Sequence, residues 1–262
     1  MTSLSDHWKG LRFNRLDFDR AYVVDQVLSQ TPRSRVFLVR RRGGSQQTVM
    51  KLRDRTAVNR LETECLRSLR HPGIASYLGH GITRDRRQWL ETEYIDGEPL
   101  TAWLDKRTRV EGKPDESVGR SEAVNVFLQL VSIVQYLHCC GWLHGDLSPQ
   151  NILVSTGKRG VVLIDFEHAR ESGSSTEKVV PRKHSLSYAS PHELAGGRTT
   201  EACEQFALGK LGFLMLGPCD KQANNGLEMA LSRATAAEAH ARYTNLFALA
   251  HEVQTAAGTA ST

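Results

Sequence analysis

Three residues with acidic or amide side chains are spaced so that one hairpin would bring them together. Asp146 and Asn151 precede a short apolar run, and Asp165 follows a second one. A turn containing Gly, Lys and Arg, residues 157–160, separates the two runs, which predicts a β-hairpin with a loop at each end. Carboxylate and amide oxygens suit a divalent cation that holds phosphates, with one carboxylate left to orient a nucleophile. The spacing therefore favours phosphate chemistry at this hairpin.

The stretch 140–170 resembles the catalytic and metal-binding loops of protein kinases, H-R-D-x-x-x-x-N followed by D-F-G. Here the two loops read HGDLSPQN and DFE. Gly145, Ser148 and Glu167 take the places of the usual Arg, Lys and Gly. An H-G-D loop is also seen among kinase-like phosphotransferases that act on small molecules. The loops therefore indicate a kinase-like fold more strongly than they indicate a protein kinase.

A lysine with a candidate acidic partner supports the same resemblance. Lys51 follows Val36 by 15 residues, as the family spacing between the Gly-rich loop and the V-A-I-K lysine requires. The apolar residues of 61–69 recur at helical spacing. This segment resembles the αC helix, in which Glu62 would pair with the lysine. Glu64 is the alternative partner, although it would lie on another face of the helix.

The Gly-rich loop is the weakest part of the resemblance. The family pattern G-x-G-x-x-G-x-V would place glycines at Ser29, Thr31 and Ser34. Glycine permits close backbone approach to phosphates, and Pro32 has no N–H to donate. We expect a phosphate-covering loop that is looser or differently shaped, in which hydroxyl groups or neighbouring arginines compensate.

Residues 92–97, which begin within the predicted strand at 88–95, resemble the hinge between kinase lobes. Thr92 would be the gatekeeper, and the backbone of Glu93 and Ile95 would meet the adenine edge. The resemblance thus implies an ATP-binding set that comprises Val36, Val49, Lys51, Thr92, Glu93, Ile95, Leu153 and Ser34.

Alternation and helical spacing predict the remaining elements. Strand-like runs occupy 22–28, 36–39, 48–52, 74–78 and 88–95. Helices are expected at 100–106 and from Ser121 to Gly141, separated by an exposed loop at 107–119. Cys139 and Cys140 are expected to pack at the end of the second helix.

Later features resemble protein kinases more than small-molecule phosphotransferases. Residues 171–183 fit an activation segment, and 185–193 resemble its G-T-x-x-Y-x-A-P-E close. Glu204 stands for the Asp that opens the αF helix, and Glu193 is expected to pair with Arg242. The αG region would be shortened to roughly residues 218–226, which puts the mode of substrate docking in doubt.

The resemblance implies an α+β, bilobal protein kinase-like fold. The N-lobe, about 21–93, would hold a small antiparallel β-sheet with one helix. The C-lobe, about 97–262, would be mainly helical and shortened. Residues 1–20 would form an N-terminal lead-in.

Composition sets further limits. The chain has 262 residues, 40% of them hydrophobic and 24% charged, and a net charge of +5. This mild charge suits phosphate handling and gives no specific indication of nucleic acid. No apolar run approaches the roughly 18 residues of a membrane span, and residues 1–20 do not resemble a secretory signal. The five cysteines have no C-x-x-C spacing and predict free thiols. We expect a cytoplasmic protein.

The resemblance implies phosphoryl transfer from ATP with Mg²⁺, most simply by a Ser/Thr-type protein kinase with a protein substrate. Lys51, fixed by Glu62, would hold the α- and β-phosphates. Asp165 and Asn151 would bind Mg²⁺, and Asp146 would accept or orient the substrate hydroxyl proton. A phosphotransferase for a non-protein substrate and a pseudokinase that acts as a binding or scaffolding module are the alternatives.

Overall fold

A computed structural model describes most of the chain. The described residues are 21–54, 59–83, 86–108, 116–155, 157, 159–173, 186–217 and 225–258. They form two compact units, the first within 21–70 and 75–95 and the second comprising His71–Ile74 and the residues from Asp96 onward. The predicted lead-in at 1–20, most of the activation segment and residues 218–224 lie outside the described residues.

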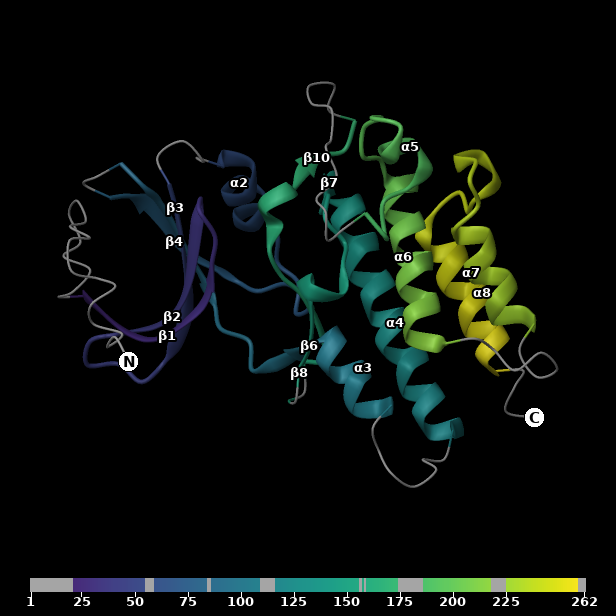
Figure 1. The fold of residues 1–262 in the computed structure, drawn as a ribbon, viewed down its shortest axis with the longest axis horizontal. Helices are drawn as coiled ribbons and strands as arrows, with labels where there is room; N and C mark the ends of the chain where they lie inside the picture. The colour runs from purple at the N-terminus through teal and green to yellow at the C-terminus, as the bar shows by residue number, and fades with distance from the viewer. Residues whose placement is uncertain are drawn as a thin grey trace. The chain divides into compact units, whose positions relative to one another are not determined.

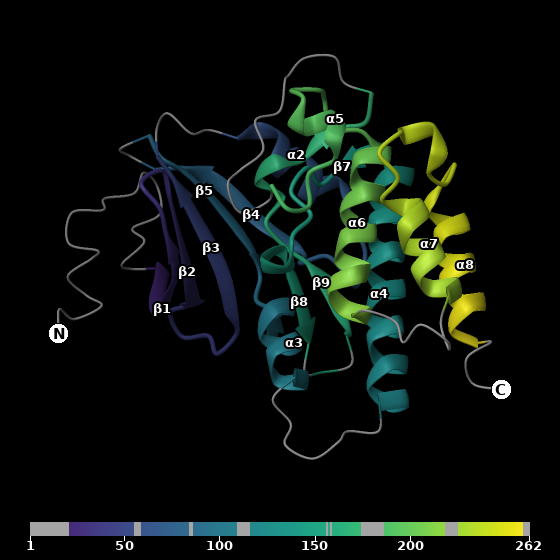
Figure 2. The ribbon, with the colours of Figure 1, turned by 45° about the vertical axis from the view of Figure 1, so that its right-hand side comes forward.

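The first unit is an antiparallel sheet with a helix. Its strand order is β1-β2-β3-β5-β4, and every neighbouring pair is antiparallel (Figures 1 and 2). The strands are β1 (Tyr22–Gln30), β2 (Ser34–Arg41), β3 (Gln47–Arg53), β4 (Tyr77–Ile82) and β5 (Gln88–Glu93). The helix is α2 (Arg60–Ser68), which begins where the Asn59 side chain accepts a hydrogen bond from the N–H of Glu62.

The two faces of this sheet have different roles. Side chains alternate between the faces along each strand, so every second residue of β2 and β3 can enter one core. That core is the buried cluster of Tyr22, Phe37, Val39, Met50 and Leu52. Val49 and Lys51 are offset by one residue from Met50 and Leu52 and therefore point to the opposite face.

The second unit is mainly helical. Its helices are α3 (Leu100–Thr108), α4 (Glu116–Cys139), α5 (Pro191–Leu194), α6 (Glu201–Leu216), α7 (Asn225–Ala234) and α8 (Leu246–Gly258). In both ribbon views α4, α6, α7 and α8 lie side by side (Figures 1 and 2). Phe127 and Leu130 of α4 and Leu208 and Leu211 of α6 are fully buried. The predicted fold class is confirmed.

Short strands complete the second unit. β6 (Gly97–Pro99), β8 (Ile152–Ser155) and β9 (Val161–Leu163) form a sheet, and β7 (Trp142–Leu143) pairs with β10 (Arg170–Glu171). β8 and β9 are antiparallel, with Ile152 opposite Leu163. The hairpin predicted between the two loops is therefore present.

Three expectations about these elements were wrong. The strand expected at 74–78 runs instead from Tyr77 to Ile82, because Ile74 forms a parallel bridge with Leu163 in the second unit. The helix expected from Ser121 begins at Glu116. Arg107 stabilises this extra turn, since it donates to the carbonyl of Gly119 and to Glu122.

The third concerns the cysteines at the end of α4. Cys139 and Cys140 are exposed rather than packed, because the helix ends at the surface. Both are free thiols, as are the buried Cys65 and Cys203. Among the described residues, no helix combines the length and apolar character needed to cross a membrane.

Candidate active site

The residues predicted to bind the nucleotide in the first unit share one face of the sheet. Val36 lies opposite Lys51 in the β2–β3 register, and Val49 lies opposite Thr92 in the β3–β5 register. Cross-strand partners point to the same side, and Val49 and Lys51 are two residues apart. The strand pairing therefore presents these four side chains together. Ser34 is the first residue of β2 and lies two residues before Val36, so its side chain is on the same face of the sheet.

Lys51 pairs with the predicted glutamate. Its Nζ lies 3.0 Å from Oε1 of Glu62, and the Lys51 side chain is 11% exposed. Glu64, the alternative partner, is exposed on another face of α2. A second cation shares the carboxylate: Arg53 donates through Nε, at 3.1 Å, and through Nη2 to Oε2 of Glu62. The kinase resemblance does not include this arginine.

The turn between β1 and β2 binds its own backbone. The Thr31 hydroxyl accepts hydrogen bonds from the N–H groups of Arg33 (3.3 Å) and Ser34 (3.0 Å). The N–H of Thr31 in turn donates to the carbonyl of Ser34 at 2.8 Å. With Pro32 lacking an N–H, the turn presents no unengaged amide from residue 31 to 34. In this conformation the backbone of the turn cannot donate to phosphates as a Gly-rich loop does.

The segment predicted as the hinge begins at the end of β5. The N–H of Glu93 donates to the carbonyl of Ser76 at 2.9 Å. In this conformation the N–H of Glu93 is therefore not available to an adenine edge. Ile95 is buried, with 6% exposure.

In the second unit, the loop before β8 holds Asp146 and Asn151 together. The Asn151 side-chain nitrogen donates to the main-chain oxygen of Asp146 (2.8 Å) and to its Oδ2 (3.1 Å). A one-turn 3₁₀ helix, Pro149–Asn151, sets this spacing. Because the amide nitrogen points to Asp146, the amide oxygen is the atom that Asn151 can offer to a cation. Among the described residues, no group of three or more His, Cys, Asp and Glu forms a metal cluster.

Asp165 lies at the other end of the hairpin. The N–H of Ile164 donates to the carbonyl of Asn151 at 2.9 Å. This contact places Asp165, the next residue, close to Asn151. Asp165 has φ 59° and ψ 73°, a left-handed conformation that non-glycine residues rarely adopt. Such conformations concentrate at functional sites. One carboxylate and one amide oxygen fit Mg²⁺, which typically takes one or two carboxylates and completes its shell with water and substrate phosphates.

His144 and Phe166 support these loops by packing. Their rings are 4.8 Å apart, and both residues are buried. His144 Nε2 contacts the carbonyl of Ile164 at 3.0 Å, while Nδ1 accepts from the N–H of Asp146 at 3.3 Å. The neutral ring with its proton on Nε2 satisfies both contacts, so His144 ties the two loops together.

Comparison with known proteins decides the family. The protein kinase domain family matches residues 22–245, which is most of the chain. The chain belongs to the protein kinase domain family. Serine/threonine-protein kinase 36 of Pongo abelii is 33% identical over 178 residues, which are 65% of this chain and 13% of that protein. The probable serine/threonine-protein kinase PknB of Lactococcus lactis is 26% identical over 166 residues, 62% of this chain and 25% of that protein. The kinase domain described here spans a quarter or less of these relatives.

Solved structures agree on the fold. The Cydia pomonella granulovirus kinase PK-1 has a TM-score of 0.74 at 15% identity, over 90% of this chain and 93% of that one. The Mycobacterium tuberculosis PknI kinase domain has a TM-score of 0.65 at 20% identity, over 94% of this chain and 98% of that one. At these identities the likeness concerns the kinase fold alone.

A buried carboxylate on α6 holds the loop that contains Asp146. Glu204 Oε1 accepts from the N–H of Gly145 (2.8 Å), and its Oε2 contacts His138 Nε2 (2.8 Å). Burial by itself raises the pKa of Glu204, but the hydrogen bond and charge of His138 and the Gly145 N–H together hold it below its ordinary value. Glu204 therefore stays ionised and fixes the backbone directly before Asp146.

Gly145 occupies the place of the family arginine for a steric reason. Its φ is +75°, and an added Cβ would lie 2.3 Å from the carbonyl oxygen of His168. No L-residue fits both conditions without a backbone shift. The H-G-D form is thus required by the backbone next to the D-F-E loop.

Gly145→Ala is expected to destabilise the kinase domain by about 2–4 kcal/mol, from backbone strain plus the clash with His168. Gly141→Ala is the matched control, because Gly141 has a similar φ of +77° but nothing within 4 Å of an added Cβ. That variant should cost about 1–2 kcal/mol. Thermal or urea unfolding of both measures the difference, and equal losses would remove the steric explanation.

Glu193 and Arg242 do not form the expected direct ion pair, although burial lowers the pKa of Arg242 and the charge of Glu193 is one of those that oppose this lowering. Both oxygens of Glu193 are engaged locally, by Ser190 in a capping box and by the Thr199 hydroxyl at 2.8 Å. Arg242 donates instead to the carbonyls of Ala236 (2.8 Å), Ala202 (2.6 Å) and Ala237 (3.0 Å). His192 separates Pro191 from Glu193, so Glu193 becomes the N3 residue of α5, where its carboxylate caps the helix.

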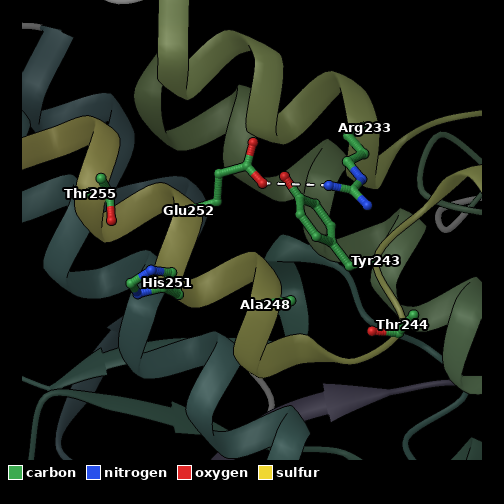
Figure 3. Close-up of a pocket in the computed structure, with 7 residues that line it drawn as sticks. All are labelled: Arg233, Tyr243, Thr244, Ala248, His251, Glu252 and Thr255. Carbon is green, nitrogen blue, oxygen red and sulfur yellow. Dashed lines mark ion pairs between the residues drawn. The ribbon is translucent and has the colours of Figure 1, made fainter.

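A separate hollow lies between α7 and α8, with a volume of about 330 Å³ (Figure 3). The carboxylate of Glu252 lies 3.7 Å from Arg233, whose guanidinium stacks 4.4 Å from the centre of the Tyr243 ring. Figure 3 shows the Tyr243 hydroxyl directed at the same carboxylate. Burial, followed by the contact with Glu252, raises the pKa of Tyr243. None of the predicted site residues lines this hollow, and the contacts among Arg233, Glu252 and Tyr243 link α7 to α8.

Two polar residues of the site were missed by sequence reasoning. Arg53 lies two residues after Lys51, and Gln88 is its direct cross-strand partner on β5. Neither belongs to a kinase motif. The one available signal was the position of Arg53 at the end of an apolar strand. Burying its charge there without a partner would cost free energy, so a carboxylate partner was to be expected.

Proposed function

We propose that this chain is an ATP- and Mg²⁺-dependent protein kinase that transfers the γ-phosphate to a Ser or Thr hydroxyl. The observation that carries the proposal is the contact of the Asn151 amide with both the backbone and the carboxylate of Asp146. It orients a proton acceptor and a metal ligand in one rigid loop. The names of the curated relatives support serine/threonine specificity.

Each charged residue has a distinct task in this mechanism. Lys51, held by Glu62, binds the α- and β-phosphates of ATP. Asp165 and the oxygen of Asn151 would hold Mg²⁺, which would supply positive charge to balance the phosphates of ATP. Asp146 orients the attacking hydroxyl and accepts its proton. Catalysis of this kind is mostly positioning and electrostatic stabilisation.

The catalytic loop contributes no cation of its own. Ser148 replaces the family lysine, and HGDLSPQN contains no Lys or Arg. The charge that develops on the transferred phosphoryl group must therefore be balanced mainly by Mg²⁺ and Lys51. Gly145 likewise removes the arginine that would meet a phosphate on the activation segment, so control by phosphorylation of that segment is not expected to take its usual form.

One observation favours a second function, that of a pseudokinase which binds partners without transfer. The Thr31 hydroxyl occupies the amides of Arg33 and Ser34, which would otherwise be candidates for phosphate contacts. The complete set of Lys51, Glu62, Asp146, Asn151 and Asp165 opposes this alternative.

Incubation of the purified chain with γ-labelled ATP and Mg²⁺, alone and with general protein substrates, separates the functions. Label in Ser or Thr of protein supports the proposal. ATP turnover without label in protein would indicate a non-protein substrate. No turnover at any Mg²⁺ concentration would indicate the pseudokinase. Asp165→Asn, purified in the same way, is the negative control that reveals activity from contaminating kinases.

Because the turn at residues 31–34 hydrogen-bonds to itself, we predict weak ATP binding that depends on Mg²⁺ and Lys51. Lys51→Met should lower the affinity about 10- to 100-fold, since hydrogen bonds to charged groups are worth more than neutral ones. Ser34→Ala should lower it about threefold or less, because the Ser34 N–H and hydroxyl already contact Thr31 (3.0 and 3.1 Å). Calorimetry across a Mg²⁺ series measures both. Tight binding without Mg²⁺ that survives Lys51→Met would contradict this account.

A further inference from the structure

We propose that Arg53 is a positioning residue that holds Glu62, and with it the start of α2, against the sheet independently of Lys51. This inference deepens the proposed function, because it concerns how the phosphate-binding lysine and its partner are kept in place. It rests on contacts within the first unit.

The β-strand geometry directs both cations at one carboxylate. Lys51 and Arg53 are two residues apart in β3, so they extend from the same face of the sheet. Lys51 reaches Oε1 of Glu62 at 3.0 Å, and Arg53 reaches Oε2 with two of its nitrogens. Each carboxylate oxygen thus has its own cation.

The cluster formed by Lys51, Arg53 and Glu62 is buried, so its ion pairs matter for the stability of the first unit. The side chains of Arg53 and Glu62 are 5% and 3% exposed. Removing the sole partner of a buried charge is strongly destabilising, because the remaining charge is left uncompensated. Here Glu62 keeps a cation when Lys51 is turned away or removed. Arg53 suits the task, since its planar group presents several donors in a fixed geometry and stays protonated.

Gln88 fastens the same end of α2 from the neighbouring strand. Gln88 lies opposite Arg53 in the β3–β5 register. Its side chain accepts from the N–H of Asn59 (2.8 Å) and donates to the carbonyl of Asn59 (3.2 Å) and to the hydroxyl of Thr63 (3.2 Å). The cap and the first turn of α2 are therefore bound to β3 and β5 by side chains other than Lys51.

This arrangement has a consequence for control. In protein kinases the position of this helix and its ion pair with the lysine are points of regulation. A helix start held by Arg53 and Gln88 leaves Lys51 available to phosphate without loss of the anchor. We therefore infer that α2 of this chain stays docked in the absence of nucleotide.

Hydrogen exchange of the α2 amides in the nucleotide-free full chain tests the inference without any requirement for activity. Arg53→Met should speed exchange across residues 60–68 by about 10- to 100-fold, the loss expected for hydrogen bonds to a charged group. Lys51→Met should change it by about twofold or less, because Arg53 still compensates Glu62. Arg53→Lys should fall between them, and it carries the comparison if the Met variant does not fold.

Arg40→Met is the matched control, because Arg40 also pairs with a carboxylate, that of Asp25 at 2.9 Å, but is 44% exposed. It should leave α2 exchange unchanged. Faster exchange in Lys51→Met than in the Arg53 variants, or no change in the Arg53 variants, would overturn the inference.

Enzyme kinetics on folded variants distinguishes a positioning role of Arg53 from a contribution to stability alone. If the chain transfers phosphate, Arg53→Met should lower kcat/KM for ATP by about 10- to 100-fold at a temperature where it remains folded, and Arg53→Lys should restore part of it. Unchanged kinetics in folded Arg53→Met would contradict a positioning role. Absence of transfer in the unmodified chain would refute the proposed function and leave the exchange test standing.

Discussion

Asp165→Asn is expected to abolish Mg²⁺-dependent turnover of ATP. The substitution removes the negative charge of the carboxylate at the metal end of the hairpin and leaves a neutral amide, which holds a hard cation less strongly than a carboxylate does. The backbone should not change, because Asn tolerates the left-handed conformation that Asp165 adopts, with φ 59°. Turnover of labelled ATP and calorimetric binding of Mg²⁺-ATP are the measurements.

The same variant should unfold at nearly the temperature of the unmodified chain, which separates loss of metal binding from loss of fold. Metal-free nucleotide binding should also be nearly unchanged. Full activity in Asp165→Asn would refute the assignment of this loop to metal binding and, with it, the proposed mechanism.

Asp146→Asn is expected to slow phosphoryl transfer by about 10²–10⁴-fold, the usual contribution of a positioned general base. Its contact with Asn151 can survive, since the amide oxygen of the new side chain still accepts a hydrogen bond. Nucleotide affinity should therefore stay nearly constant while kcat falls. Single-turnover kinetics and calorimetry on the same preparation measure the two quantities.

A matched loss of affinity and rate in Asp146→Asn would show that Asp146 is a metal or structural residue. Asn151→Asp provides the comparison. It replaces the amide nitrogen that donates to Asp146 at 3.1 Å with a second anion, and it should disturb the loop itself. Greater loss of unfolding temperature in Asn151→Asp than in Asp146→Asn would agree with this division of roles.

The hairpin between Asp146 and Asp165 was predictable because its signals are local. Two short apolar runs and a turn with glycines specify the pairing of β8 with β9, and the flanking loops follow. The contact of Lys51 with Glu62 was predictable from spacing and helical phase, because Glu64 falls on another face of α2. The roles of these residues in catalysis remain predictions.

The Glu193–Arg242 contact failed because each residue found other partners. The capping box around Glu193 is a local structure, in which the carboxylate bonds to Ser190 three residues earlier. Arg242 is surrounded by carbonyls from residues 202, 236 and 237, which chain folding alone brings together. The sequence alone reveals neither the local partners of Glu193 nor the carbonyls that bind Arg242.

By itself the sequence determined the family, the fold class, the hairpin with its polar residues and the lysine–glutamate pair. These follow from periodicity, turn chemistry and motif spacing, which act over short distances along the chain. Only the tertiary structure decided that Arg53 and Gln88 hold α2, that Thr31 closes the turn upon itself and that Gly145 has no room for a side chain. Those outcomes depend on strand register, helix docking and the approach of His168, which bring together groups that the sequence leaves apart.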